Sequence, residues 1–173
     1  MLKQIKYNSL IKQLKNKIFS YALFMVNNRM DAEDITQEVF IKLWDNFENI
    51  NLTKAKSWLL SSTHNLSIDY IRKRKNKTRD TMDISENSIS KEQNFLADPE
   101  ISYKRNLLKD RINSSIKKLP DNLKSVFVLY EIEGFKYKEI SKTLNVPINS
   151  VKVYLLRARK KLQKDLKEFR YEN

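Results

Sequence analysis

Residues 137–166 constrain the fold more than any other part of the sequence. They combine a short helical stretch, Tyr137–Leu144, with four turn residues that include Pro147 and a long basic stretch that begins near Asn149. The residue before a proline is pushed out of helical geometry, so the helix should break at this point. The segment therefore predicts two helices that are joined by a tight turn.

The second of these helices is predicted to have two chemically different faces. Apolar side chains recur every three or four residues along it and fall on one narrow stripe: Val151, Leu155, Ala158, Leu162, Leu166 and Phe169. The other face presents amide, cationic and two apolar side chains: Asn149, Lys152, Val153, Leu156, Arg157, Lys160 and Lys164. This pattern is typical of a helix-turn-helix whose second helix enters the DNA major groove. A basic amphipathic hairpin that binds nothing is the alternative.

The composition favours an all-α fold and excludes several kinds of site. The 173 residues include one glycine and three prolines, and Leu, Ile, Lys and Glu are abundant. The absence of cysteine excludes disulfides, thiolate zinc sites and cysteine nucleophiles. A single histidine, His64, excludes multi-histidine metal sites, and a single glycine, Gly134, excludes phosphate-binding glycine loops. We therefore expect no metal or other cofactor.

Charge divides the chain into three parts. The net charge of +13 favours a polyanionic partner, and it is +6 over residues 1–75, −3 over residues 76–102 and +10 over residues 103–173. The middle part is rich in Ser, Asn, Asp and Glu and lacks apolar periodicity, which predicts a flexible acidic linker between two small helical domains. No stretch approaches the roughly 18–20 apolar residues of a membrane span. We expect a cytoplasmic protein without membrane insertion.

A helix in the N-terminal part is predicted to begin at Asp31, which is placed to cap it. Ile35, Val39 and Leu43 form its core face. A second apolar group, Phe40, Ile41 and Trp44, lies beside Asp34, Gln37 and Glu38. This group is either buried within the domain or part of a mixed polar and apolar docking surface.

The next predicted helix, residues 54–75, has a core face of Leu59, Leu66 and Tyr70. A second stripe along it combines an aromatic residue with hydroxyl, amide and charged groups: Trp58, Ser61, Ser62, Asn65, Asp69 and Arg72. Such groups suit contact with bases and phosphates, because an aromatic ring can stack on a base. A solvated face would explain the polar residues but not Trp58. Further on, Pro120 and Asp121 suit a helix start, and Gly134 suits a left-handed helix end.

Three blocks of this sequence resemble the extracytoplasmic-function (ECF) group of bacterial RNA polymerase sigma factors. They are DAEDITQEVFIKLW, SWLLSSTHNLSIDYIRKRK and the long block from Leu119 to Leu162, in the order and spacing of that family. The resemblance implies a region 2 bundle in residues 1–75, a region 4 helix-turn-helix in residues 103–173, and a subunit without enzymatic activity. Such a subunit binds core polymerase and directs transcription initiation at −10 and −35 promoter elements.

The resemblance also implies roles for individual residues. Docking on the β′ clamp helices falls to Asp34, Gln37, Glu38, Phe40 and Trp44. Contact with the −10 element falls to Trp58, Ser61, Ser62, Asn65, Asp69 and Arg72. Reading of the −35 element falls to Asn149, Ser150, Lys152, Val153, Leu156 and Arg157, with Lys160 and Lys164 on the phosphate backbone. Expected partners are core polymerase, through its β′ clamp helices and β flap, promoter DNA, and an anti-sigma factor.

Two other functions are compatible with parts of the sequence. A stand-alone helix-turn-helix regulator would use the same C-terminal segment but leaves the two N-terminal blocks unexplained. A metal-dependent nuclease would use the carboxylates Asp31, Glu33, Asp34 and Glu38, which lie at one helix start without a converging partner. His64 and Ser67 depart from the common family pattern, so the promoter sequence preference stays open.

Overall fold

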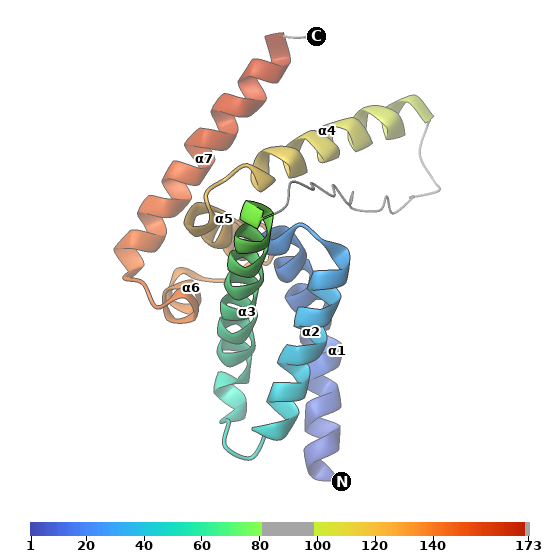
Figure 1. Ribbon diagram of the computed structural model, residues 1–173, viewed down its shortest axis with the longest axis vertical. Coiled ribbons are helices and arrows are strands. Elements are labelled where there is room, and N and C mark those ends of the chain that lie inside the picture. Colours follow the sequence, from blue (N-terminus) through green and yellow to red (C-terminus); the bar gives the residue numbers. More distant parts are fainter. Residues whose placement is uncertain (81–98, 172–173) are drawn as a thin grey trace.

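The computed structural model describes residues 1–80 and 99–171, and all regular structure within these ranges is helical (Figure 1). In chain order the elements are α1 (Leu2–Val26), α2 (Arg29–Asp45), α3 (Leu52–Asp80), α4 (Pro99–Lys117), α5 (Asp121–Phe127), the π-helix η1 (Val128–Ile132), α6 (Tyr137–Leu144) and α7 (Ile148–Tyr171). The predicted all-α fold is confirmed. Most of the predicted linker, residues 81–98, lies outside the described residues.

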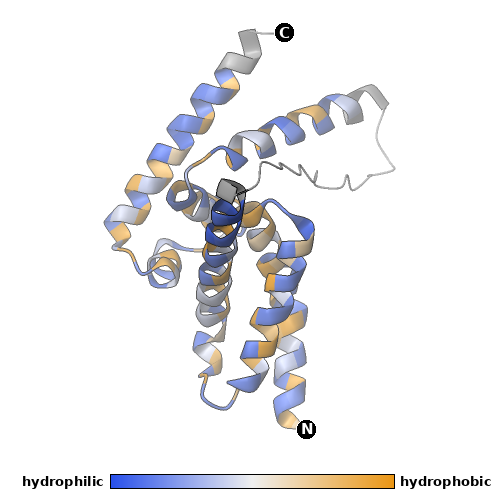
Figure 2. Cartoon of the chain, viewed as in Figure 1, coloured by the Kyte–Doolittle hydropathy of each residue, from blue (hydrophilic) through white to orange (hydrophobic). Residues whose placement is uncertain are grey.

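Helices α1, α2 and α3 form a bundle with a fully buried centre. Its largest buried side chains include Tyr21 from α1, Ile35 and Leu43 from α2, and Leu59 from α3. The apolar residues of each helix recur at three- and four-residue spacing, so each helix turns one face inward. The predicted core face of α2 is thus confirmed. Figure 2 shows hydrophilic and hydrophobic residues alternating along α2 and mostly hydrophilic residues along the upper part of α3.

The start of α2 differs from the prediction. Asn27 ends α1 in the left-handed conformation, with a φ of 52°, and the side chain of Asn28 accepts a hydrogen bond of 3.0 Å from the backbone N–H of Asp31. The N-cap is therefore Asn28, and the prediction of Asp31 was wrong. Asp31 lies in the first helical turn, where its charge still suits the helix dipole, and it forms an ion pair with Arg74.

Helix α3 is longer than the predicted helix of residues 54–75, because it continues to Asp80. Its basic end is tied back to the bundle: Arg74 donates a 2.9 Å hydrogen bond to the carbonyl oxygen of Val26. The first residues of the predicted linker, 76–80, are accordingly helical.

The predicted single helix after Pro120 is divided into α5 and η1. The backbone N–H of Glu133 bonds the carbonyl of Val128 at 3.0 Å, five residues earlier, and that of Phe135 bonds Leu129 at 2.9 Å. Gly134 follows with a φ of +73°, which confirms its predicted left-handed conformation at the corner. Single turns of π-helix are rare and often mark functional sites.

Helices α6 and α7 form the predicted helix-turn-helix. Asn145 ends α6 with a φ of 53°, and the Ser141 hydroxyl donates to the carbonyl of Val146 at 2.6 Å, which fixes the turn. The apolar stripe of α7 is buried at Val151, Leu155, Ala158 and Leu162. Its last predicted member, Phe169, lies outside the residues whose side chains the structure describes.

The two halves of the chain pack against each other. Helix α6 lies beside α3, and α1 contacts α5 and η1 (Figure 1). One hydrophobic core continues from the α1–α3 bundle into α5–α7. In the described part of the chain, no helix combines the length and apolar character that crossing a membrane requires.

Candidate nucleic-acid and polymerase interfaces

The exposed side of α7 carries nearly all the residues predicted to read DNA. This recognition face consists of Asn149, Lys152, Val153, Leu156, Arg157 and Lys160. Val153 and Leu156 are 43% and 53% exposed although they are apolar, while the opposite stripe is buried. Ser150 is only partly exposed, at the edge of this face. The packing of α7 therefore leaves a long, mainly cationic surface open.

Aromatic and charged residues of η1 and α6 contact one side of α7. The rings of Tyr130 and Tyr137 stack with centroids 4.8 Å apart. Arg159 donates to the Glu131 carboxylate at 2.7 Å and lies over the Tyr130 ring, and this hydrogen bond raises the pKa of Arg159. Lys152 of the recognition face lies 6.0 Å from the Tyr137 ring. Sequence reasoning missed these supporting residues, because their pairing depends on the fold of η1.

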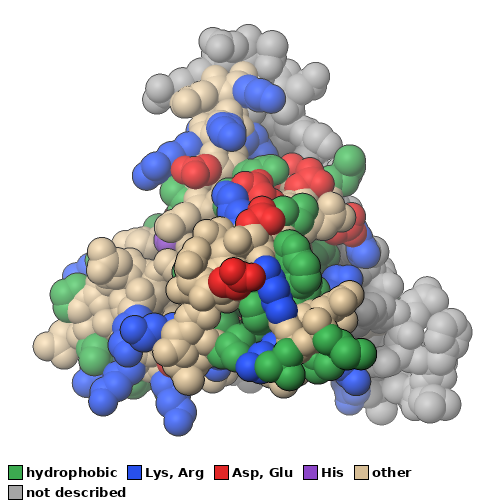
Figure 3. All heavy atoms as spheres, turned by 90° about the horizontal axis from the view of Figure 1, so that it is seen from below, with side chains coloured by type: hydrophobic (Ala, Val, Ile, Leu, Met, Phe, Trp, Pro, Cys, Tyr) green, Lys and Arg blue, Asp and Glu red, His purple; other side chains and the backbone are tan. Residues whose placement is uncertain are grey.

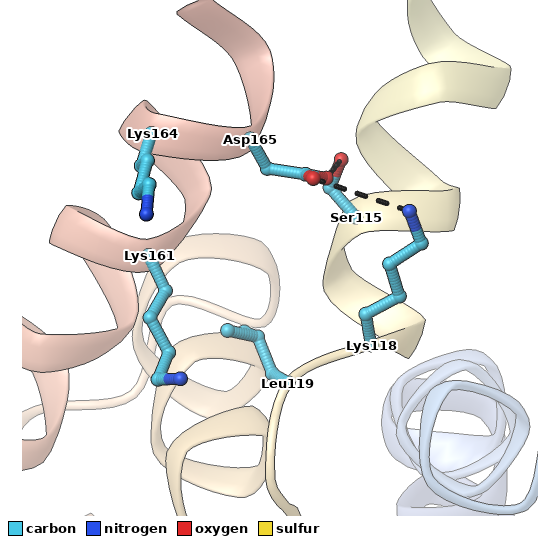
Figure 4. A pocket seen from close by; sticks show the side chains of 6 residues that line it. All are labelled: Ser115, Lys118, Leu119, Lys161, Lys164 and Asp165. Atoms are coloured by element: carbon cyan, nitrogen blue, oxygen red, sulfur yellow. Dashed lines mark hydrogen bonds and ion pairs between the residues drawn. The ribbon is translucent and has the colours of Figure 1, made fainter. Parts of the chain in front are cut away.

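Lys164, predicted to contact phosphate, borders a hollow of about 280 Å³ between α4 and α7 (Figure 4). Figure 4 shows Lys161, Lys164 and Asp165 on α7, with Ser115 and Lys118 on the α4 side of the hollow. Asp165 accepts a hydrogen bond from the Ser115 hydroxyl and lies 3.9 Å from the ammonium of Lys118. Lys164 is therefore placed beside α4 as well as near the end of the cationic side of α7.

The outer side of α2 exposes acidic, amide and apolar groups to solvent. This docking face consists of Asp34, Gln37, Glu38, Ile41 and Trp44. Trp44 is 39% exposed, its ring meets that of Tyr7 edge-on at 4.9 Å, and the ammonium of Lys3 lies 4.8 Å from it. Trp44 is thus held in a fixed orientation at the surface. Ile41, 59% exposed, belongs to the same surface but was left out of the predicted set.

Phe40 does not lie on the docking face. Its side chain is 6% exposed and belongs to the core, and its carbonyl oxygen accepts a 2.8 Å hydrogen bond from the Tyr7 hydroxyl. Of the two alternatives for the second apolar group, burial holds for Phe40 and exposure for Ile41 and Trp44. Phe40 can support the docking face from beneath but is not available for direct contact in this structure.

The carboxylates at the start of α2 are paired with cations of the chain. Arg29 contacts Glu33 at 2.9 Å, Lys42 contacts Glu38 at 2.7 Å, and Arg74 contacts Asp31. In the described ranges no three acidic or histidine side chains converge as a metal site would require. Ion pairing therefore accounts for Asp31, Glu33 and Glu38 without a metal.

Helix α3 presents three different faces. Its outer face carries the predicted −10 residues, of which Asn65, Asp69 and Arg72 are exposed and Trp58, Ser61 and Ser62 are half-buried. A second face packs into the bundle through Leu59. Burial raises the pKa of Tyr70, and the nearby carboxylates of α2 raise it further. The third face meets α6.

His64 lies where α3 meets the second half of the chain. Its Nδ1 atom is 2.8 Å from the Tyr21 hydroxyl, and burial lowers its pKa, against a smaller opposing effect of Asp121. This contact joins α3 to α1, which gives His64 a structural role. Figure 3 shows the molecule from below, with acidic side chains grouped near the middle and upper part of this face and basic side chains spread around them.

Comparison with known proteins identifies the family. Residues 10–77 match Sigma-70 region 2, and residues 109–162 match Sigma-70 region 4. The chain is 32% identical to the ECF RNA polymerase sigma factor SigW of Bacillus subtilis, with 96% of this chain and 95% of SigW covered. The chain belongs to the ECF sigma factors. The sigma factor is also 30% identical to SigM of Bacillus subtilis, over 86% of this chain and 87% of SigM.

Two solved structures share the fold of this sigma factor. One is the sigma factor RpoE in complex with the anti-sigma factor NepR from Bartonella quintana, with a TM-score of 0.77, 20% identity and coverage of 93% of this chain and 96% of that chain. The other is CnrH in complex with the cytosolic domain of CnrY, with a TM-score of 0.68, 19% identity and coverage of 94% and 88%.

Membership of this family gives the chain its function, which is promoter-directed initiation of transcription. The region 2 match covers the two N-terminal blocks that a stand-alone helix-turn-helix regulator leaves unexplained. The sigma factor is therefore favoured over that alternative.

Proposed function

We propose that three exposed faces divide the work of this sigma factor. The docking face of α2 binds the β′ clamp helices of core polymerase, the outer face of α3 binds the −10 element, and the recognition face of α7 reads the −35 element. Region 4 also contacts the β flap. One observation carries the proposal: the faces of α2 and α7 are largely exposed, and that of α3 is exposed at Asn65, Asp69 and Arg72, although the opposite side of each helix is buried in the core.

The chemistry of the docking face suits a protein partner. Interfaces are enriched in aromatic anchors that are surrounded by polar groups, and Trp44 stands among Asp34, Gln37 and Glu38 in this way. The contact of Trp44 with Tyr7 reduces the freedom that the indole would lose on binding.

The chemistry of α3 and α7 suits nucleic acid in two different forms. On α3, Trp58 can stack on an unpaired base while Arg72 reaches phosphate. On α7, Asn149, Ser150 and Lys152 lie in the first turn, where the helix dipole favours anions and short side chains reach base edges. Lys160 and Lys164 lie further along and are assigned to the phosphate backbone.

The proposal extends to partners and setting. Because both structural neighbours are bound to a partner protein, which for the sigma factor RpoE is an anti-sigma factor, we include an anti-sigma factor among the partners of this chain. The protein would act in the cytoplasm with RNA polymerase, and as a specificity subunit without catalysis of its own.

Run-off transcription with purified core polymerase on genomic fragments tests the proposal. We expect transcripts only when both the sigma factor and core are present, from start sites that share two upstream motifs. A matched pair of variants sharpens the result: Trp44→Ala should reduce all transcripts by weakening core binding, whereas Arg157→Ala should change promoter choice while core binding persists. DNA binding with no affinity for core would instead support a stand-alone regulator.

A further inference from the structure

The corner between η1 and α6 inserts into the α1–α3 bundle. Phe135, directly after Gly134, is 2% exposed. The ammonium of Lys17 on α1 lies 5.3 Å from the centre of its ring, and that of Lys56 on α3 lies 4.4 Å from it. Both distances are within the range of a cation–π contact. Region 2 thus holds an aromatic side chain of region 4 between two lysines, which we term the lysine clamp.

Each lysine of the clamp also makes a polar contact with the same segment. Lys17 donates to the carbonyl oxygen of Glu133 at 2.8 Å, and Lys56 pairs with the Glu139 carboxylate at 3.0 Å. The other oxygen of Glu139 accepts the backbone N–H of Lys136 at 2.8 Å, at the start of α6. The first helix of the helix-turn-helix is therefore fixed to region 2 through both its preceding corner and its first turn.

One side of the contact between the two regions, at the margin of the continuous core, is less closely packed. A cavity of about 420 Å³ lies between α3 and the helices α5, α6 and α7, bordered by Ile68, Ile71, Leu144 and Tyr154. At its edge Lys75 and Asp121 are 3.7 Å apart. This side of the contact is partly open to solvent and therefore contributes less close packing than a filled interior would. The lysine clamp and the continuous core beside it are the closely packed parts of the contact.

When regions 2 and 4 are packed together as in this structure, which we call the closed arrangement, one molecule is too short to reach both promoter elements at once. Their names place them about 25 base pairs apart, which is roughly 85 Å of duplex at about 3.4 Å per base pair. Helix α7 has 24 residues and is therefore about 36 Å long. Because α3 packs on α6 and α6 packs on α7, at roughly 8–10 Å per contact, the outer face of α3 and the recognition face cannot lie 85 Å apart.

We propose that the lysine clamp around Phe135 is an intramolecular latch that keeps the free sigma factor closed. Region 4 must leave the clamp before one molecule can bind the −10 and −35 elements together. This inference rests on the proposed assignment of those elements to α3 and α7. Apparent affinity falls in proportion to the fraction of binding-competent molecules, so the closed population lowers the rate and affinity of promoter engagement.

The latch can be opened without altering a proposed binding face. The double variant K17Q/K56Q removes both cations but leaves Phe135 and α6 unchanged, and K6Q/K15Q removes the same charge from exposed positions of α1 as a control. The chain has no cysteine, so K12C and K142C provide unique dye sites on regions 2 and 4. Energy transfer between the dyes reports closure, and circular dichroism verifies that each variant is folded.

We expect energy transfer to fall in K17Q/K56Q and to match the wild type in K6Q/K15Q. With core polymerase and a promoter that carries both elements, K17Q/K56Q should form complexes at least about threefold faster than the control. Equal energy transfer in K17Q/K56Q and wild type would overturn the latch, and so would reduced transfer without faster promoter binding. Failure of the wild type to give transcripts with core would instead overturn the proposed function, whatever the energy transfer shows.

Discussion

At the scale of single residues, two buried titratable groups lie near the contact between the regions and respond to pH in opposite directions. Burial raises the pKa of Glu133, although a hydrogen bond from Ser20 and the charge of Lys17 oppose this effect. Burial lowers the pKa of His64, with Asp121 opposing. Each group is held closer to neutral than it would be in the unfolded chain, so each costs stability in the pH range where it is charged.

For Glu133 we predict that replacement by glutamine stabilises the protein at pH 7. The folded-state pKa is above the unfolded one, so the folded chain binds the proton more tightly and stability falls as pH rises from about 4.5 through the raised pKa. Glu133→Gln removes this loss while keeping the shape and the backbone acceptor for Lys17. Urea unfolding of both proteins between pH 4 and 7 measures the difference in their free energies of unfolding. Parallel stability curves would contradict a buried, destabilised carboxylate.

For His64 the expected dependence of stability on pH has the opposite sign. Its folded-state pKa lies below the unfolded value of 6.5, so stability is complete above pH 6.5 and is lost as pH falls toward the lowered pKa. His64→Gln should abolish that loss, at the expense of the contact with the Tyr21 hydroxyl. Unfolding free energies at pH 7.5 and 5.5 give the comparison. If the variant loses as much stability on acidification as the wild type, His64 is not the responsible group.

At the scale of elements, the two sides of α2 should respond differently to truncation. Trp44→Ala removes an exposed aromatic anchor and should weaken core binding about thirtyfold, which corresponds to about 2 kcal/mol. Phe40→Ala removes a buried ring and should instead lower the free energy of unfolding by about 3–5 kcal/mol. Core affinity by fluorescence titration and stability by denaturation separate these effects. Unchanged core affinity in folded Trp44→Ala would remove α2 from the interface.

The recognition helix should likewise contain two kinds of DNA contact. Lys152→Ala in its first turn should cost about 1–3 kcal/mol on the preferred −35 sequence and much less on a scrambled one. Lys160→Ala should weaken binding to all sequences alike and flatten the salt dependence by about one unit. Binding of both variants to matched and scrambled duplexes over a range of salt tests this. An equal loss on both duplexes would make Lys152 a phosphate contact.

The elements show which features local sequence determines. The helix-turn-helix was predicted closely because Pro147, the apolar stripe and the basic face all act within a few residues of one another. The start of α2 was misplaced by three residues, since Asn28 and Asp31 are both good caps and only the actual backbone path distinguishes them. The π-helix η1 was missed because its i to i+5 bonding has no marker in the apolar spacing.

Residue contacts between distant segments were beyond prediction. Phe40 and Ile41 are adjacent and both apolar, yet one is buried and the other exposed, which depends on where α1 and Tyr7 lie. The clamp of Lys17 and Lys56 around Phe135 joins residues more than 75 positions apart, and no spacing rule links them. Sequence therefore predicted which faces are exposed better than it predicted the contacts that position those faces.

At the scale of the whole molecule, salt should act on the closed contact and on DNA binding at once. Salt screens the ion pairs of Lys56 with Glu139 and of Lys75 with Asp121, which favours opening. Salt also weakens DNA binding, because the counterions released from neutralised phosphates gain less entropy in a more concentrated salt solution. In the wild type, easier opening of the closed contact at high salt partly offsets the weaker binding to DNA.

The variant K17Q/K56Q, in which the latch is already open, should therefore show a steeper salt dependence of promoter binding than the wild type. The control K6Q/K15Q carries the same net charge, so a general change in electrostatic attraction would affect both variants equally. Plots of log affinity against log salt concentration for the three proteins, each with core polymerase, provide the measurement. If the slopes of K17Q/K56Q and K6Q/K15Q coincide, opening is not linked to salt, and the wild-type slope reports phosphate contacts alone.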